Sequence, residues 1–132
     1  MVGQFRNGHL DPHYTGYFEL FNRQKFFEAH DVLEQIWLLD RHGPNGAFYK
    51  GLIQLAGAFV HLQKNRTRPA AALFNLALAN FEKYPSPHEK LNLVAVRQLV
   101  AGWQWQLEKD DYEVNPLSPV NIPQLALQKS EV

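Results

Sequence analysis

The sequence predicts an all-α protein, an antiparallel bundle of about five helices followed by an irregular, proline-rich C-terminal tail. Apolar residues recur with a period of about 3.6 in five segments, and breaks rich in glycine, proline or asparagine separate these segments. No segment shows the alternation of a β-strand. The 132 residues have the length of one domain, so we expect residues 1–132 to form a single helical domain with residues 113–132 as a surface strap.

The first three helices are predicted from aromatic spacing and one strong break. Four aromatic residues at helical spacing predict a helix over residues 13–21. A short turn at residues 22–24 leads into the second helix, over residues 25–39. The segment His-Gly-Pro-Asn-Gly at residues 42–46 ends that helix, and the third helix follows over residues 47–64.

Prolines mark the expected starts of the last two helices. Pro69 suits the first position of a fourth helix, over residues 69–84. The sequence Ser86-Pro87-His88-Glu89 has the pattern of a capping box, with Ser86 as the N-cap. We therefore expect the fifth helix over residues 87–109. The fourth helix is apolar around most of its circumference, which predicts either a central place in the bundle or a face shared in a homodimer.

The C-terminal tail combines prolines with apolar residues. Prolines at positions 116, 119 and 123 exclude a long helix after residue 111. Four apolar residues between and beside them are expected to lie against the bundle surface. They are Leu117, Val120, Ile122 and Leu125.

Charge and composition exclude several classes of partner. Thirteen basic residues balance thirteen acidic ones, so we expect neither nucleic acid nor an anionic membrane as a partner. The apolar stretches 52–62 and 70–81 are too short and too polar to span a bilayer. Residues 1–7 lack the apolar core of a signal peptide. The absence of cysteine excludes thiolate metal sites and is typical of a reducing compartment, so we expect a cytoplasmic protein.

His30 and Glu34 lie where the second helix should bury apolar side chains. At about 100° per residue, Glu34 lies within about 40° of His30, on the face that carries Phe26 and Trp37. Asp31 falls on the opposite side, toward solvent. A polar pair on an apolar face requires a hydrogen bond, a counter-charge or a metal ion.

The short break at residues 42–46 should fold the second and third helices into an antiparallel hairpin. In that register Glu34 lies opposite Gln54, and His61 lies near Phe27. The spacing therefore predicts one interhelical cluster of four polar residues: His30, Glu34, Gln54 and His61.

This cluster predicts two classes of function. In the first, His30, Glu34 and His61 bind a divalent transition metal such as zinc, iron or manganese. Glu34 also serves as general base, Gln54 orients water or substrate, and the protein is a metal-dependent hydrolase-like enzyme acting on a small molecule. In the second, hydrogen bonds among the same residues lock two helices in register. The protein is then a non-catalytic interaction or ligand-binding module with a protein or small-molecule partner.

Several short motifs lie in the second and third expected helices and just before them. They are Phe21-Asn22, Phe27-Glu28-Ala29-His30-Asp31-Val32-Leu33-Glu34, Trp37, Gly51-Leu52-Ile53-Gln54-Leu55-Ala56 and His61. In combination they resemble the motifs of the domain of unknown function 309 family. The resemblance covers about residues 18–84 and implies a small all-helical protein. It implies functional positions at Glu28, His30, Glu34, Trp37, Gln54 and His61, together with the family's label of predicted metal-dependent hydrolase.

Overall fold

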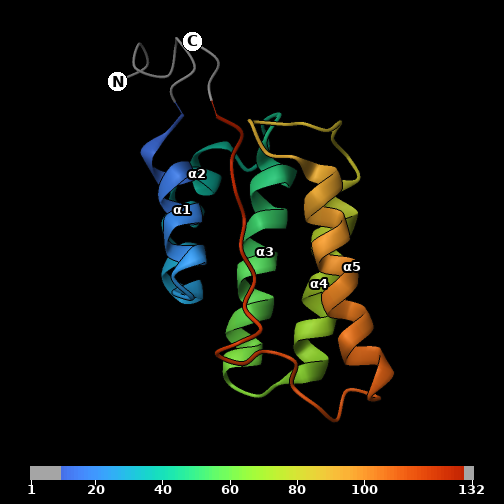
Figure 1. The fold of residues 1–132 in the computed structure, drawn as a ribbon. Coiled ribbons are helices and arrows are strands. Elements are labelled where there is room, and N and C mark those ends of the chain that lie inside the picture. Colours follow the sequence, from blue (N-terminus) through green and yellow to red (C-terminus); the bar gives the residue numbers. More distant parts are fainter. Residues whose placement is uncertain (1–9, 130–132) are drawn as a thin grey trace.

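The computed structural model describes residues 10–129, and the predicted all-α class is confirmed (Figure 1). The described chain contains five helices and no strand, only isolated β-bridges. The helices are α1 (Pro12–Asn22), α2 (Phe26–Asp40), α3 (Gly46–Gln63), α4 (Thr67–Phe81) and α5 (Leu93–Lys109). The first four agree with their expected bounds to within about three residues. Both ends of the chain, residues 1–9 and 130–132, lie outside the described residues.

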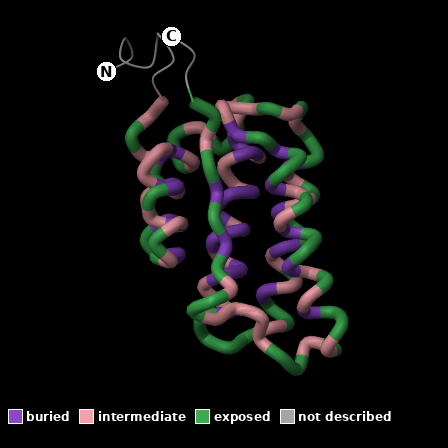
Figure 2. The backbone as a smooth tube through the Cα atoms, viewed as in Figure 1, coloured by how far each residue is buried: buried purple, intermediate pink, exposed green. Residues whose placement is uncertain are grey.

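Consecutive helices pack side by side, and α3 lies in the middle of the bundle (Figure 1). α1 and α2 form one side, while α4 and α5 form the other. Buried residues lie on the inner faces of the helices and along part of the tail (Figure 2). Among residues 10–129, no helix combines the length and the hydropathy that crossing a membrane requires.

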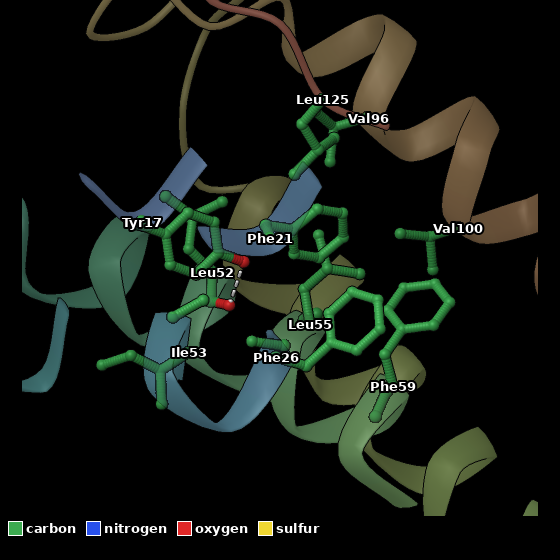
Figure 3. Packing of buried hydrophobic residues seen from close by; sticks show 14 of the residues in the cluster. Tyr17, Phe21, Phe26, Leu52, Ile53, Leu55, Phe59, Val96, Val100 and Leu125 are labelled. Carbon is green, nitrogen blue, oxygen red and sulfur yellow. Dashed lines mark hydrogen bonds between the residues drawn. The ribbon is translucent and has the colours of Figure 1, made fainter. Parts of the chain in front are cut away.

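Phe59 is the aromatic centre of the core. Its ring lies 5.6 Å from the ring of Phe21 on α1, 5.1 Å from Phe26 on α2, 5.2 Å from Phe74 on α4 and 5.0 Å from Trp103 on α5. One side chain of α3 therefore contacts an aromatic ring from each of the other four helices. Three of these four pairs are edge-to-face, the arrangement that aromatic quadrupoles favour. Part of this cluster is drawn in Figure 3.

A buried hydrogen bond joins α1 to α3. The hydroxyl of Tyr17 donates to the carbonyl oxygen of Leu52 at 2.6 Å (dashed line in Figure 3). Tyr17 is fully buried, so this bond satisfies a hydroxyl that water does not reach. At the start of α1, Asp11 is the N-cap, and its carboxylate accepts the N–H of His13 at 2.7 Å.

The predicted start of α5 was wrong. The helix begins at Leu93, and Asn92 rather than Ser86 is its N-cap, with the Asn92 side chain accepting a hydrogen bond from the first turn at 3.1 Å. His88 and Leu91 instead pair across a tight turn, through N–H···O bonds of 3.0 and 2.8 Å. The capping-box pattern is therefore present in the sequence but opens no helix.

Tertiary contacts of His88 explain this difference. Its ring lies 4.7 Å from the ring of Phe48 and 4.6 Å from that of Tyr84. Its Nε2 lies 2.7 Å from Oδ1 of Asn45, at the start of α3. These contacts hold His88 against the bundle, and a local capping signal cannot outweigh them.

The predicted irregular, proline-rich tail is confirmed, and it packs on three helices. Residues 113–129 contain no helix and run along the front of α3 in Figure 1. Asn115 donates to the carbonyl of Leu62 at 2.5 Å, and further contacts join the tail to α1 and α5.

Two of the four apolar tail residues do not lie on the bundle as expected. Leu125 is buried and Leu117 packs against the core, but Val120 is 94% exposed and Ile122 is 42% exposed. Ser118 and Asn121 pair across a turn, so Val120 projects from its tip. The turn geometry therefore overrides the apolar pattern here.

Candidate functional site

α2 and α3 are adjacent in the predicted antiparallel register. Near the connecting loop, Nζ of Lys50 lies 4.4 Å from the ring centroid of Trp37. At the far end of the hairpin, Phe27 and His61 line the same pocket. The Lys50–Trp37 contact at one end of the helix pair and the shared pocket at the other agree with the register that the five-residue break implied.

The pocket has a volume of about 240 Å³ and is formed by three helices. Its lining includes Phe27 and His30 from α2, Gly57, Val60 and His61 from α3, and Leu73 from α4. Lys64, the residue that caps the C-terminus of α3, completes it. The walls are mostly apolar, and the two imidazoles and the ammonium group supply the polar atoms.

His30 belongs to a group of three metal-binding side chains. One ligand atom each of His30, Asp31 and Glu34 lies within 4.8 Å of the other two. Residues one turn apart on a helix project side by side, which explains the contribution of Glu34. Asp31 is 57% exposed, as expected for the solvent side, yet its Oδ1 lies 3.6 Å from Nδ1 of His30. His61 is not a member of this group.

The two histidines of the pocket carry unpaired polar atoms. Nδ1 of His30 and Nδ1 of His61 are both inaccessible to solvent and have no hydrogen-bond partner. Buried polar atoms are normally paired, and an unpaired one costs about 1–3 kcal/mol. Both histidines line the pocket, and neither Nδ1 has a hydrogen-bond partner among the described residues.

Gln54 is directed toward α4 and not into this pocket. Its Oε1 accepts a hydrogen bond from Asn80 at 2.8 Å, and Oδ1 of Asn80 accepts one from Lys83 at 3.0 Å. Gln54 is not part of the pocket lining. The polar cluster predicted between α2 and α3 is therefore divided, with Gln54 in a separate contact between α3 and α4.

The hydrogen-bond lock expected under the alternative hypothesis is not formed. Within residues 10–129, no hydrogen bond joins any two of the side chains of His30, Glu34, Gln54 and His61. His30 and His61 both line the pocket but share no hydrogen bond. Apolar packing and the Lys50–Trp37 contact hold the register of the two helices instead.

The pKa of His61 is lower than the ordinary value for histidine. Burial lowers the pKa of its imidazole, and the positive charges of Arg66 and Lys64 lower it further. Both effects disfavour the protonated ring. His61 is therefore neutral at neutral pH, with its buried Nδ1 unpaired.

Comparison with known families identifies the helical core. The family model described as Domain of unknown function (DUF309) matches residues 14–73. This match supports the assignment of the segment to the DUF309 family. The match begins at residue 14, four residues before the start of the expected span of about 18–84. It ends at the pocket residue Leu73, eleven residues before the end of that span. Comparisons with curated proteins and with solved structures give no match.

The DUF309 segment contains every residue of the pocket and of the three-residue group. Sequence reasoning did not assign Asp31, Lys64 or Leu73 to the site. Asp31 was assigned to solvent by helical phase alone, and its carboxylate bends back toward His30. Leu73 belongs to α4. The residue spacing within α2 and α3 does not indicate where α4 packs against these two helices. The basic residues at 64–68 were visible in the sequence, but nothing in the sequence placed them beside a cavity.

Proposed function

We propose that this DUF309 protein is a metal-dependent hydrolase whose metal site is formed by His30, Asp31 and Glu34. The observation that carries the proposal is the approach of three ligand atoms to within 4.8 Å of one another beside a pocket that His30 also lines. The unpaired Nδ1 of His30 supports it, because metal coordination is one way of satisfying a buried imidazole nitrogen.

The donor set fits a divalent transition metal. One imidazole and two carboxylates suit zinc, iron or manganese, and three protein ligands leave positions open for water and substrate. A bound ion of this kind would lower the pKa of water and polarise a carbonyl or phosphoryl oxygen. Relative to the set expected from the sequence, Asp31 takes the place of His61 as the third ligand.

The remaining pocket residues have roles that their positions suggest. His61 is neutral at neutral pH because its pKa is lowered, so its ring is available to accept a proton from water or to hydrogen-bond a substrate. Phe27, Val60 and Leu73 form apolar walls that exclude water from the ligand. Gln54 lies outside the lining, and this proposal gives it no role in orienting water.

Metal binding is tested first, on the full chain dialysed against a chelator. Zinc and manganese are titrated into the metal-free protein, and binding is followed by calorimetry and by elemental analysis after desalting. Wild-type protein should bind one equivalent. His30→Ala, Asp31→Asn and Glu34→Gln should each weaken binding by about 10-fold or more, since each removes a ligand. Glu19→Gln, which changes an exposed carboxylate on α1 outside the group of three, is the matched control and should bind like wild type.

Hydrolysis is tested second, with ester, amide and phosphate-ester reporter substrates. Activity should require the metal, disappear with chelator and fall in the three ligand variants but not in Glu19→Gln. Protein that binds no metal would overturn the proposal. Protein that binds one equivalent but hydrolyses none of the reporters would favour the non-catalytic ligand-binding alternative.

The cellular location is a separate proposal. We place the protein in the cytoplasm because the chain has no cysteine, which is typical of proteins that need no oxidative cross-link. Fractionation of cells with a detectable tag tests this location, and recovery in an extracytoplasmic fraction would contradict it.

A further inference from the structure

The two ends of the pocket differ in charge. On the α2 side, the lining residue His30 also belongs to the group of three that contains the carboxylates of Asp31 and Glu34. The pocket is therefore next to two carboxylates on this side. At the C-terminus of α3 the lining includes the basic residue Lys64, and Arg66 follows two residues later. Within residues 10–129, neither Lys64 nor Arg66 forms an ion pair, because both ion pairs there belong to histidines.

The charges of Lys64 and Arg66 reach the pocket wall at His61. Arg66 and Lys64 both lower the pKa of the His61 imidazole, so both cations act on the pocket wall. The N-terminal dipole of α2 is positive, but Glu28 lies in the first turn of that helix and offsets it. The C-terminal dipole of α3 has the opposite sign, and the two unpaired cations offset it.

The middle of the pocket is apolar and partly open. Phe27 is 58% exposed although it lines the pocket, and its ring lies parallel to the imidazole of His30 with centroids 6.3 Å apart. Val60 and Leu73 are partly buried beside it. A ligand with an apolar body would cover Phe27 and gain about 25 cal/mol for each Å² removed from water. The volume of about 240 Å³ lies below the usual range for drug-sized ligands, so the ligand is small.

We propose that this pocket binds a small amphiphilic anion, with a carboxylate or phosphate group against Lys64 and an apolar body over Phe27 and Leu73. Naming this anion as the substrate class of the enzyme rests on the proposed hydrolase function. The binding itself does not need the metal, because the cation and the apolar walls lie apart from Asp31 and Glu34.

The experiment uses the metal-free full chain and three probes of similar size. Hexanoate and hexyl phosphate carry the two candidate anions, and hexanamide is their neutral counterpart. Binding is measured by calorimetry and by shifts of backbone amide resonances. At least one anion should bind 10-fold or more tightly than hexanamide, and added salt should weaken its binding. The tighter of the two anions identifies the group. Equal binding of hexanamide and both anions, or no binding of any probe, would overturn the proposal.

Variants locate the site. Lys64→Met should weaken binding of the preferred anion at least fivefold. Lys129→Met removes the same charge from an exposed position in the tail, outside the pocket lining, and should leave binding unchanged. Phe27→Ala should weaken hexanoate but leave the much weaker binding of acetate unaffected. Equal effects of Lys64→Met and Lys129→Met would overturn the proposal, since only net charge would then matter. All three positions are exposed, and thermal unfolding confirms that each variant is folded.

The same samples separate this inference from the hydrolase proposal. Glu34→Gln should lose metal and keep the anion, whereas Lys64→Met should keep metal and lose the anion. Anion binding by a protein that takes up no metal would support the anion site and overturn the metal site. Metal uptake without anion binding would overturn the anion site alone.

Discussion

Asn22 and Leu125 are joined by two hydrogen bonds although 103 residues separate them in the sequence. Nδ2 of Asn22 donates to the carbonyl of Leu125 at 2.7 Å, and the N–H of Leu125 donates to Oδ1 of Asn22 at 2.8 Å. The side chain of Gln124 donates in addition to the carbonyl of Asn22 at 3.0 Å. The side-chain amide of Asn22, the last residue of α1, therefore binds both backbone groups of Leu125 and fixes the position of this residue.

Asn22→Ala should destabilise the protein by about 1–3 kcal/mol, because it leaves both backbone groups of Leu125 without their partner. Asn22→Asp should have an intermediate effect, since a carboxylate still accepts from the Leu125 N–H but cannot donate to its carbonyl. Urea unfolding at pH 7 measures both variants. Gln35→Ala, an exposed change on α2, is the control and should lie within about 0.5 kcal/mol of wild type. An Asn22→Ala protein as stable as that control would show that the hydrogen bonds between Asn22 and Leu125 contribute nothing to the free energy of unfolding.

Leu125→Ala should cost about 2–5 kcal/mol, the usual effect of truncating a buried leucine. Leu125 is 5% exposed and lies close to Val96 of α5 (Figure 3). Val120→Ala is the matched control in the same tail, because Val120 is 94% exposed and should change stability by less than about 0.5 kcal/mol. Equal unfolding free energies for the two variants would mean that the tail does not contribute to the core.

Gly51 and Gly102 should respond in opposite directions to substitution by alanine. A Cβ at Gly51 would lie 2.7 Å from Cε1 of Phe81, a fully buried ring that has no room to move. We expect Gly51→Ala to lower stability by about 1–2 kcal/mol, since overpacking exceeds the gain in helix propensity. A Cβ at Gly102 on α5 would meet no atom of the described residues within 4 Å, so Gly102→Ala should raise stability by about 0.5–1 kcal/mol. Thermal unfolding of the pair checks both signs, and a stabilised Gly51→Ala would contradict the close approach of α3 and α4.

The lowered pKa of His61 predicts a specific dependence of stability on pH. The usual pKa of 6.5 applies to the unfolded chain, and the folded value is lower. As the pH falls below about 6.5, the unfolded state therefore binds a proton before the folded state does, and stability decreases until the folded pKa is passed. Above 6.5 this contribution to stability is fully present.

His61→Gln removes this contribution to the pH dependence. Urea unfolding at pH 7.5 and pH 5.5 should show a smaller loss of stability in the variant than in wild type. Lys64→Met is the companion variant, and it should raise the pKa of His61 because a neighbouring positive charge is gone. Imidazole resonances followed by NMR report that shift. An unchanged pKa in Lys64→Met would contradict the contact between Lys64 and the pocket.

Local patterns predicted the helices and one tertiary contact. The spacing of apolar residues placed α1 to α4 correctly, because each pattern depends only on residues within one helix. The short break at residues 42–46 also fixed the register of α2 and α3, since so short a connection allows few arrangements other than an antiparallel hairpin. That register put His61 near Phe27, and the two residues line the same pocket. The contact between Lys50 and Trp37 fits the same register.

The candidate site was predicted only in part. His30 and Glu34 come together because both lie on α2 one turn apart. Gln54 also lies on α3 as expected, but Asn80 of α4 binds its side chain, and α4 was not placed by any local signal. The start of α5 shows the same limit, since the contacts of His88 with the distant residues Phe48 and Asn45 outweigh the capping pattern around it.

The sequence by itself determined the all-α class, the helix boundaries up to α4 and the pairing of α2 with α3, because these follow from periodicity and from one short loop. Only the tertiary structure decided which polar residues share a pocket, where α5 begins and how Asn22 pairs with the tail at Leu125. Those features depend on contacts between residues far apart in the chain, and such contacts are selected by the packing of the whole bundle.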